Sequence, residues 1–60
     1  MTRTEATLLV LRRLQSGPAT TQELLTLTRK KHPKTIRRYA GEIEDAGWAV
    51  RWDAGEWRLA

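Results

Sequence analysis

Six of the eleven basic residues of this 60-residue chain lie within ten positions, and that segment contains no acidic residue. These residues are Arg29, Lys30, Lys31, Lys34, Arg37 and Arg38, and the acidic residues Glu42, Glu44 and Asp45 follow them. A surface helix usually mixes its charges along its length, so charge of one sign at one end indicates a polyanion partner, above all the phosphate backbone of duplex DNA. Ordinary solvated surface charge is the alternative reading.

Residue types that carry catalysis or bind metals are scarce. The chain has no cysteine, which excludes disulfides and thiolate ligands, and its one histidine, His32, has no nearby acid. Ser16 has no evident general base. Glu42, Glu44 and Asp45 could form an acidic site, but Glu42 and Asp45 are expected to face solvent. We therefore expect no enzymatic activity, no metal and no cofactor.

Length and composition predict one small domain over residues 1–60 with a formal charge of +4. The longest apolar run, Leu8 to Leu11, is far too short to span a bilayer. No secretory signal is evident at the N-terminus, so we expect a cytoplasmic protein that associates with the nucleoid when bound to DNA.

Three helices are expected, at about 4–15, 21–28 and 33–46. Thr2 with Glu5, and Thr20 with Glu23, have the spacing of a capping box at the first two helix starts. Pro33 suits the first position of the third helix. The glycines at 17 and 47 are typical of helix ends.

A β-hairpin is expected at about 48–59, because Trp48, Val50 and Trp52 alternate with smaller or charged residues, as do Trp57 and Leu59. Residues 53–55 fit a three-residue hairpin loop with glycine in the left-handed position. An isolated hairpin is marginal in water, so we expect its tryptophan face to complete the core. The alternative is that one tryptophan is partly exposed in a dimer contact.

On the third helix, Ile36, Ala40 and Ile43 share one face at helical spacing, with Tyr39 on its flank. Lys34 and Arg38 lie opposite that face and point outward. The flanks of the outward face belong to Thr35 on one side and Arg37 on the other.

The predicted fold is mainly α with a small β-hairpin, in the order of a three-helix winged helix-turn-helix. Three short motifs follow this order, at residues 35–38 (TIRR), 46–48 (AGW) and 55–59 (GEWRL). In these motifs the chain resembles the winged helix-turn-helix domain of DeoR-type regulators and of the N-terminal domain of the biotin operon repressor. The resemblance implies that the third helix enters the major groove. The turn at 28–32 departs from the family pattern, since it has no glycine and one extra residue, and the wing tip at 53–56 is short and acidic.

The candidate DNA-binding residues fall into two groups by the contact expected of them. The candidates for reading base edges are Lys34, Arg38, Thr35 and His32. The candidates for phosphate contacts are Arg37, Lys30, Lys31, Thr20 and Thr21. Because Thr35 lies on the flank of the outward face, it is also a candidate for a phosphate contact. For Thr20 and Thr21 the alternative role is simple helix capping.

We therefore expect sequence-specific binding of double-stranded DNA by a small transcriptional regulator. Because a lone module buries little surface, we expect either a homodimer on two half-sites or tandem occupancy of the DNA. The alternative is a winged-helix adaptor that binds a polymerase or a replication or recombination protein through the wing. A membrane role is disfavoured because the core needs the apolar face of the third helix. A stacking platform for single-stranded nucleic acid is also disfavoured, since the basic residues lie on a different element from the tryptophans.

Overall fold

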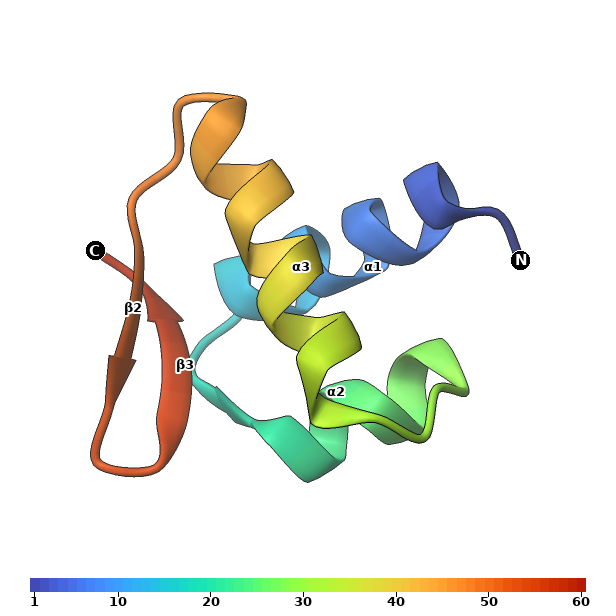
Figure 1. The fold of residues 1–60 in the computed structure, drawn as a ribbon. Coiled ribbons are helices and arrows are strands. Elements are labelled where there is room, and N and C mark those ends of the chain that lie inside the picture. The colour runs from blue at the N-terminus through green and yellow to red at the C-terminus, as the bar shows by residue number, and fades with distance from the viewer.

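The computed structural model describes residues 1–60 as three helices and a three-stranded antiparallel sheet (Figure 1). The elements are α1 (Arg3–Gln15), β1 (Ala19–Thr20), α2 (Thr21–Thr28), α3 (Pro33–Asp45), β2 (Val50–Asp53) and β3 (Glu56–Leu59). The chain is thus mainly helical, and the predicted helix bounds differ from the observed ones by at most one residue at either end. No helix is long and apolar enough to cross a bilayer.

Side-chain caps begin the first two helices, as the sequence predicts. Thr2 Oγ1 accepts a hydrogen bond from the Glu5 amide of α1 (3.2 Å). At α2, Thr20 Oγ1 accepts from the Glu23 amide (3.1 Å) and the Thr20 amide donates to Glu23 Oε1 (3.3 Å), which completes a capping box. α3 has Pro33 at its first position, and His32 precedes it without a side-chain cap.

Two helices end in the same backbone motif with different residues in its left-handed position. At the end of α3, Gly47 has φ 101° and the Trp48 amide donates to the Ile43 carbonyl (3.2 Å). At the end of α2, Arg29 has φ 58° and the next amide donates to the Leu25 carbonyl (3.0 Å). Both are Schellman motifs. The second explains how the chain turns between α2 and α3 without a glycine.

The sheet has the order β1-β3-β2, so β2 forms a free edge. β1 was not predicted; its Ala19 pairs with Trp57 and its Thr20 with Glu56. The hairpin loop predicted at 53–55 is wrong by one residue, because Asp53 pairs with Glu56 and only Ala54 and Gly55 remain in the turn. Both turn residues have positive φ (52° and 79°), the signature of a type I′ turn.

The core lies between the three helices and one face of the sheet. Its most deeply buried members are Ala6, Val10, Leu14, Ala19, Leu24, Leu25, Ile36, Tyr39 and Ile43, with Leu11, Val50, Trp57 and Leu59 packed against them. The expectation that all three tryptophans complete the core is wrong, since Trp48 is 41% and Trp52 53% exposed. Trp48 precedes β2, so strand alternation does not orient it. Trp52 shares the inner face with Trp57 but belongs to the free edge strand.

Candidate nucleic-acid interface

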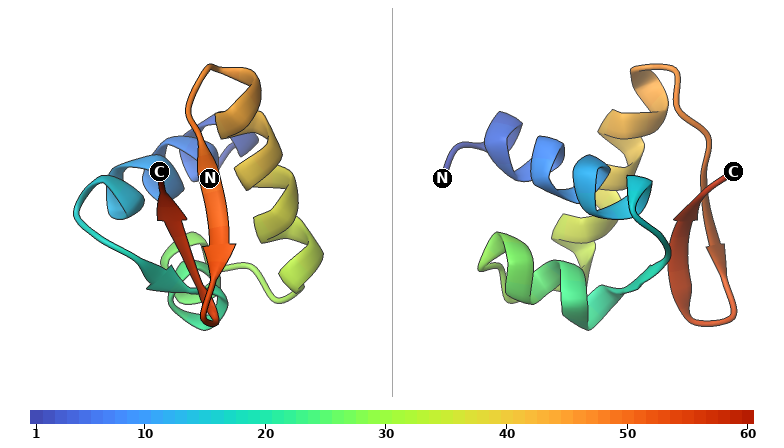
Figure 2. Two further views of the ribbon diagram at one scale, coloured as in Figure 1. Left: turned by 90° about the vertical axis from the view of Figure 1, so that its left-hand side faces the viewer. Right: turned by 180° about the vertical axis from the view of Figure 1, so that it is seen from behind.

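The outward side of α3 carries the basic residues of its first two turns. Because the buried residues of α3 occupy one face, Lys34, Arg37 and Arg38 are left exposed on the rest of the helix. In Figure 1 α3 crosses in front of α1, and Figure 2 shows the same helix running beside the hairpin. Its N-terminal half therefore faces solvent between α1 and the hairpin.

None of the six cations at positions 29–38, hereafter the basic segment, forms an ion pair, and all six are exposed. The chain's three ion pairs instead join Arg3 to Glu42, Arg13 to Glu23 and Arg58 to Glu56. Three of the seven acidic side chains are thus paired with arginines outside the basic segment. The cations of the segment have no direct ion-pair partner, although the charge of Arg38 contributes to the lowered pKa of Glu42.

One hollow, the α1-side hollow, flanks the outward side of α3. It has a volume of about 270 Å³ and is lined by Arg3, Lys30, Thr35, Arg38 and Tyr39. Three of these five residues are cationic. Sequence reasoning missed Arg3, because it precedes the basic segment by more than twenty residues and joins it only through the packing of α1 on α3. Arg3 is already paired with Glu42, so Lys30 and Arg38 are the cations of this hollow that are free to bind a phosphate.

A second hollow, the hairpin cleft, flanks α3 on the opposite side. It has a volume of about 230 Å³ and is lined by Thr21, Pro33, Arg37, Trp52 and Trp57. Trp57 Nε1 donates to Thr21 Oγ1 (3.0 Å), which joins β3 to the start of α2. The Trp52 and Trp57 ring centroids lie 4.9 Å apart with planes tilted by 56°. The cleft thus combines one cation with two aromatic side chains.

Glu42 of α3 turns toward α1, although the sequence suggests that it faces solvent. Its carboxylate accepts a hydrogen bond from Thr7 Oγ1 (2.6 Å) and pairs with Arg3. The Thr7 hydroxyl is the largest cause that holds the pKa of Glu42 below its usual value, and Arg3 adds to it. The acid closest to the basic half of α3 is thereby neutralised within the fold.

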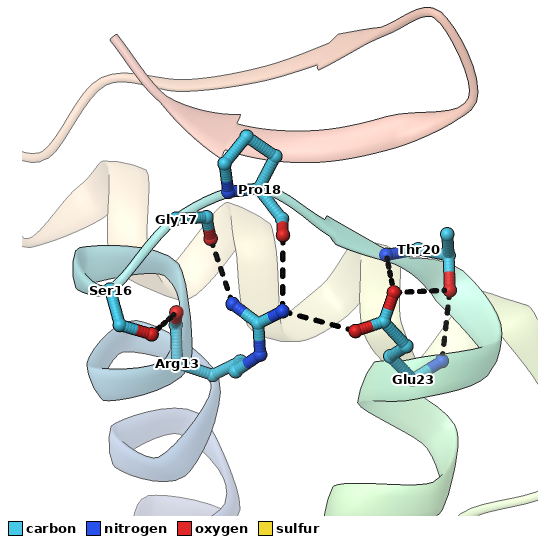
Figure 3. A network of polar contacts seen from close by, with 6 residues as sticks. All are labelled: Arg13, Ser16, Gly17, Pro18, Thr20 and Glu23. Carbon is cyan, nitrogen blue, oxygen red and sulfur yellow. Dashed lines mark hydrogen bonds and ion pairs between the residues drawn. The ribbon is translucent and has the colours of Figure 1, made fainter.

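Arg13 links the end of α1 to the start of α2 (Figure 3). Its guanidinium donates to the carbonyls of Gly17 (3.0 Å) and Pro18 (3.1 Å) and to Glu23 Oε2 (3.0 Å). The Thr20 backbone amide, followed by Arg13, lowers the pKa of Glu23. Arg13 therefore fixes the connection that positions α2.

The predicted site residues are therefore distributed unevenly. Lys34, Thr35 and Arg38 lie together, with Thr35 half-buried beside the α1-side hollow. The other candidates on or before α3 are the exposed residues Lys30, Lys31, His32 and Arg37. The two threonines at the start of α2 are engaged within the fold, since Thr20 caps the helix and Thr21 accepts a hydrogen bond from Trp57.

No group of three or more histidine or carboxylate side chains is placed to hold a metal ion. Comparison with models of protein families, with curated proteins and with solved structures gives no match.

Proposed function

We propose that this chain binds double-stranded DNA sequence-specifically through the N-terminal half of α3, as a small transcriptional regulator with a winged helix-turn-helix fold. The observation that carries the proposal is the basic segment, whose six cations are exposed and free of ion pairs. Cations that no carboxylate neutralises are available to displace the counterions of a duplex, which is the main source of affinity for DNA.

The arrangement of the elements supports a major-groove docking of α3. Three helices are followed by a hairpin, and a four-residue connection joins α2 to α3, as in a helix-turn-helix with a wing. Lys34 and Arg38 lie one turn apart on the outward side, where they would reach base edges, and Arg is suited to guanine.

Phosphate contacts would come from the two sides of α3. Arg37 lies on the hairpin side, and Lys30 lies with Arg3 in the α1-side hollow. Lys31 would add a contact from the connection before α3. These contacts would fix the orientation of the helix without reading sequence.

The distribution of acidic residues sets the direction of docking. Glu44 and Asp45 are exposed at the C-terminal end of α3, so that end would lie away from the phosphates. Asp53 and Glu56 pair beside the hairpin turn, which disfavours a grip of the tip on the backbone. We therefore propose that α3 enters the groove with its N-terminal half first.

Two copies on neighbouring half-sites are part of the proposal, because a single small module buries limited surface on DNA. The stoichiometry of the complex on a selected duplex, measured by analytical ultracentrifugation, tests this part. Two chains per site would support it, and one chain per site at saturation would contradict it.

The direct test is titration of a mixed-sequence duplex with the wild type and with Lys34→Gln/Arg38→Gln. We expect the double variant to bind at least about tenfold more weakly, because each charged contact contributes about 1 kcal/mol or more. Arg12→Gln, which removes one charge, is the control, since Arg12 is an exposed arginine without an ion pair on the side of α1 away from the core. The same loss of affinity per charge removed in the double variant and in the control would contradict the proposal.

A second candidate function, a winged-helix adaptor for a polymerase or a replication or recombination protein, is favoured by the exposure of Trp48 and Trp52. If the chain is such an adaptor, Trp48→Ala or Trp52→Ala should abolish binding of the protein partner. Replacement of Lys34 and Arg38 by glutamate should then leave the affinity for duplex DNA unchanged. The duplex titration therefore separates the two functions.

A further inference from the structure

Trp52 has an unusual position for a large aromatic side chain in a chain of this size. It contacts Trp57 on the inner face of the sheet, yet 53% of its surface is exposed. Trp57 itself is half-buried and is held by its hydrogen bond to Thr21. The pair therefore consists of one fixed ring and one largely exposed ring, and both line the hairpin cleft.

The other residues of the hairpin cleft define what would suit that accessible ring. Arg37 brings a cation and Pro33 an apolar ring to the same cleft. Thr21 accepts from Trp57 through its oxygen, and its own proton has no acceptor within the protein. At about 230 Å³ the cleft is smaller than sites for drug-sized ligands, which range from about 300 to 1,000 Å³. Its size and lining suit a single planar group that carries hydrogen-bond acceptors.

Charge decides the class of that planar group. Asp53 and Glu56 alternate with Trp52 and Trp57 along their strands, so their carboxylates lie on the opposite face of the sheet from the cleft. Arg37 and the neighbouring Lys34 are exposed and unpaired. The cleft thus favours a planar ring attached to an anionic chain, which describes a nucleobase with its phosphate.

We propose that the hairpin cleft binds one unpaired base of DNA next to the duplex held by α3, with the base stacked on Trp52 and its phosphate on Arg37. This inference rests on the proposed function, because α3 would have to hold the adjoining duplex. It assigns to the hairpin a contact with DNA that its acidic tip would not make. Duplexes with a single-stranded end, or with an unpaired base beside the binding site, are the expected ligands.

The test compares three ligands of equal paired length: a blunt duplex, a duplex with a short single-stranded overhang, and the same duplex with an abasic overhang. The two overhangs carry the same phosphates, so a difference between them reports the base alone. Wild-type protein should bind the overhang with bases about 5- to 100-fold more tightly than the abasic one, the range typical of one stacked base.

Substitutions of Trp52 and Trp48 test whether the difference in affinity between the two overhangs arises in the hairpin cleft. Trp52→Leu should reduce the ratio between the two overhangs to within about twofold while the affinity for blunt duplex stays the same. Trp52→Phe keeps an aromatic ring and should keep most of the ratio. Trp48→Leu, which removes an exposed tryptophan that does not line the cleft, should leave the ratio unchanged.

Equal binding of the two overhangs by the wild type, or a ratio that survives Trp52→Leu, would overturn the inference even if the blunt duplex is bound. Absence of binding to the blunt duplex, with tighter binding of the overhang that has bases than of the abasic overhang, would instead overturn the proposed function. The two failures are therefore distinguishable in the same set of titrations.

Discussion

Arg3 of α1 and Glu42 of α3 form an ion pair that crosses between the two helices. Thr7 donates to the same carboxylate from one turn further along α1. The pair both attaches α1 to α3 and neutralises the acid that follows the basic half of α3. Stability and the surface charge of the candidate interface are linked through this one carboxylate.

The first prediction concerns pH. Because the pKa of Glu42 is lowered in the folded state, its stabilising contribution is complete above the unfolded-state value of about 4.3 and is lost as the pH falls through the lower folded value. Glu42→Gln should therefore lose less thermal stability than the wild type between about pH 5 and pH 3. Melting temperatures followed by circular dichroism over that range give the comparison.

Glu44→Gln is the matched control, because Glu44 is an exposed carboxylate of the same helix without an ion pair. Glu23 also has a lowered pKa, so acid destabilisation should be reduced but not abolished in Glu42→Gln. Identical pH profiles for Glu42→Gln and the wild type would show that the contacts of Arg3 and Thr7 do not stabilise the fold.

The second prediction concerns the left-handed residue at the end of α2. Arg29 has φ 58°, a conformation that costs a non-glycine residue about 1–2 kcal/mol. Glycine avoids this cost, but it increases the conformational entropy of the unfolded chain, which offsets part of the gain. Arg29→Gly should therefore raise the free energy of unfolding by about 0.5–1 kcal/mol. Arg29→Val, which places a β-branched residue there, should lower it by at least about 1 kcal/mol. Urea denaturation of both variants checks the prediction, and the opposite order would contradict the Schellman ending.

The third prediction concerns the hairpin turn. Ala54 has φ 52° at the first central position of a type I′ turn, where asparagine is strongly preferred. Ala54→Asn should raise the free energy of unfolding by about 0.5–1 kcal/mol, whereas Gly55→Ala should lower it by a similar amount or more. A stabilising Gly55→Ala would favour a different turn from the two-residue loop described above.

The fourth prediction separates base reading from phosphate contact. Lys34→Ala and Arg38→Ala should flatten the preference among duplex sequences, each by about 1–3 kcal/mol at the position that the side chain reads. Lys30→Ala should weaken binding to all sequences alike. Selection from a random duplex pool with each variant measures both effects, and a preference that is unchanged in Lys34→Ala and Arg38→Ala would place base reading elsewhere.

Local signals explain why the helices could be predicted from the sequence. Thr20 with Glu23, Pro33 and Gly47 act on backbone groups within a few residues, so their spacing alone places helix starts and ends. β1 escapes this reasoning, because its two residues pair with a strand that lies more than thirty positions later. Thr20 also has the sequence signature of a helix cap, and it does cap α2, so its sequence context gives no sign that it pairs in a strand as well.

Tertiary packing explains what the sequence could not predict about the site. Clustering of the cations along the chain identifies the basic segment, but the addition of Arg3 depends on where α1 packs. Alternation along the strand predicts on which face of the sheet Trp52 lies. It does not predict whether the helices cover an edge strand, which decides how exposed Trp52 is. The tryptophans and the cations lie on different elements of the chain, yet Trp52 and Arg37 line one cleft in the folded molecule.

The salt dependence of duplex binding is the decisive measurement of whether the basic segment binds DNA phosphates. If four or five cations of the basic segment and the α1-side hollow contact phosphates, the logarithm of the association constant should fall with the logarithm of salt concentration at a slope of about −4. Removal of Lys30 should reduce the magnitude of that slope by about one. A slope near zero, or duplex binding that does not weaken between about 50 and 200 mM salt, would contradict the account.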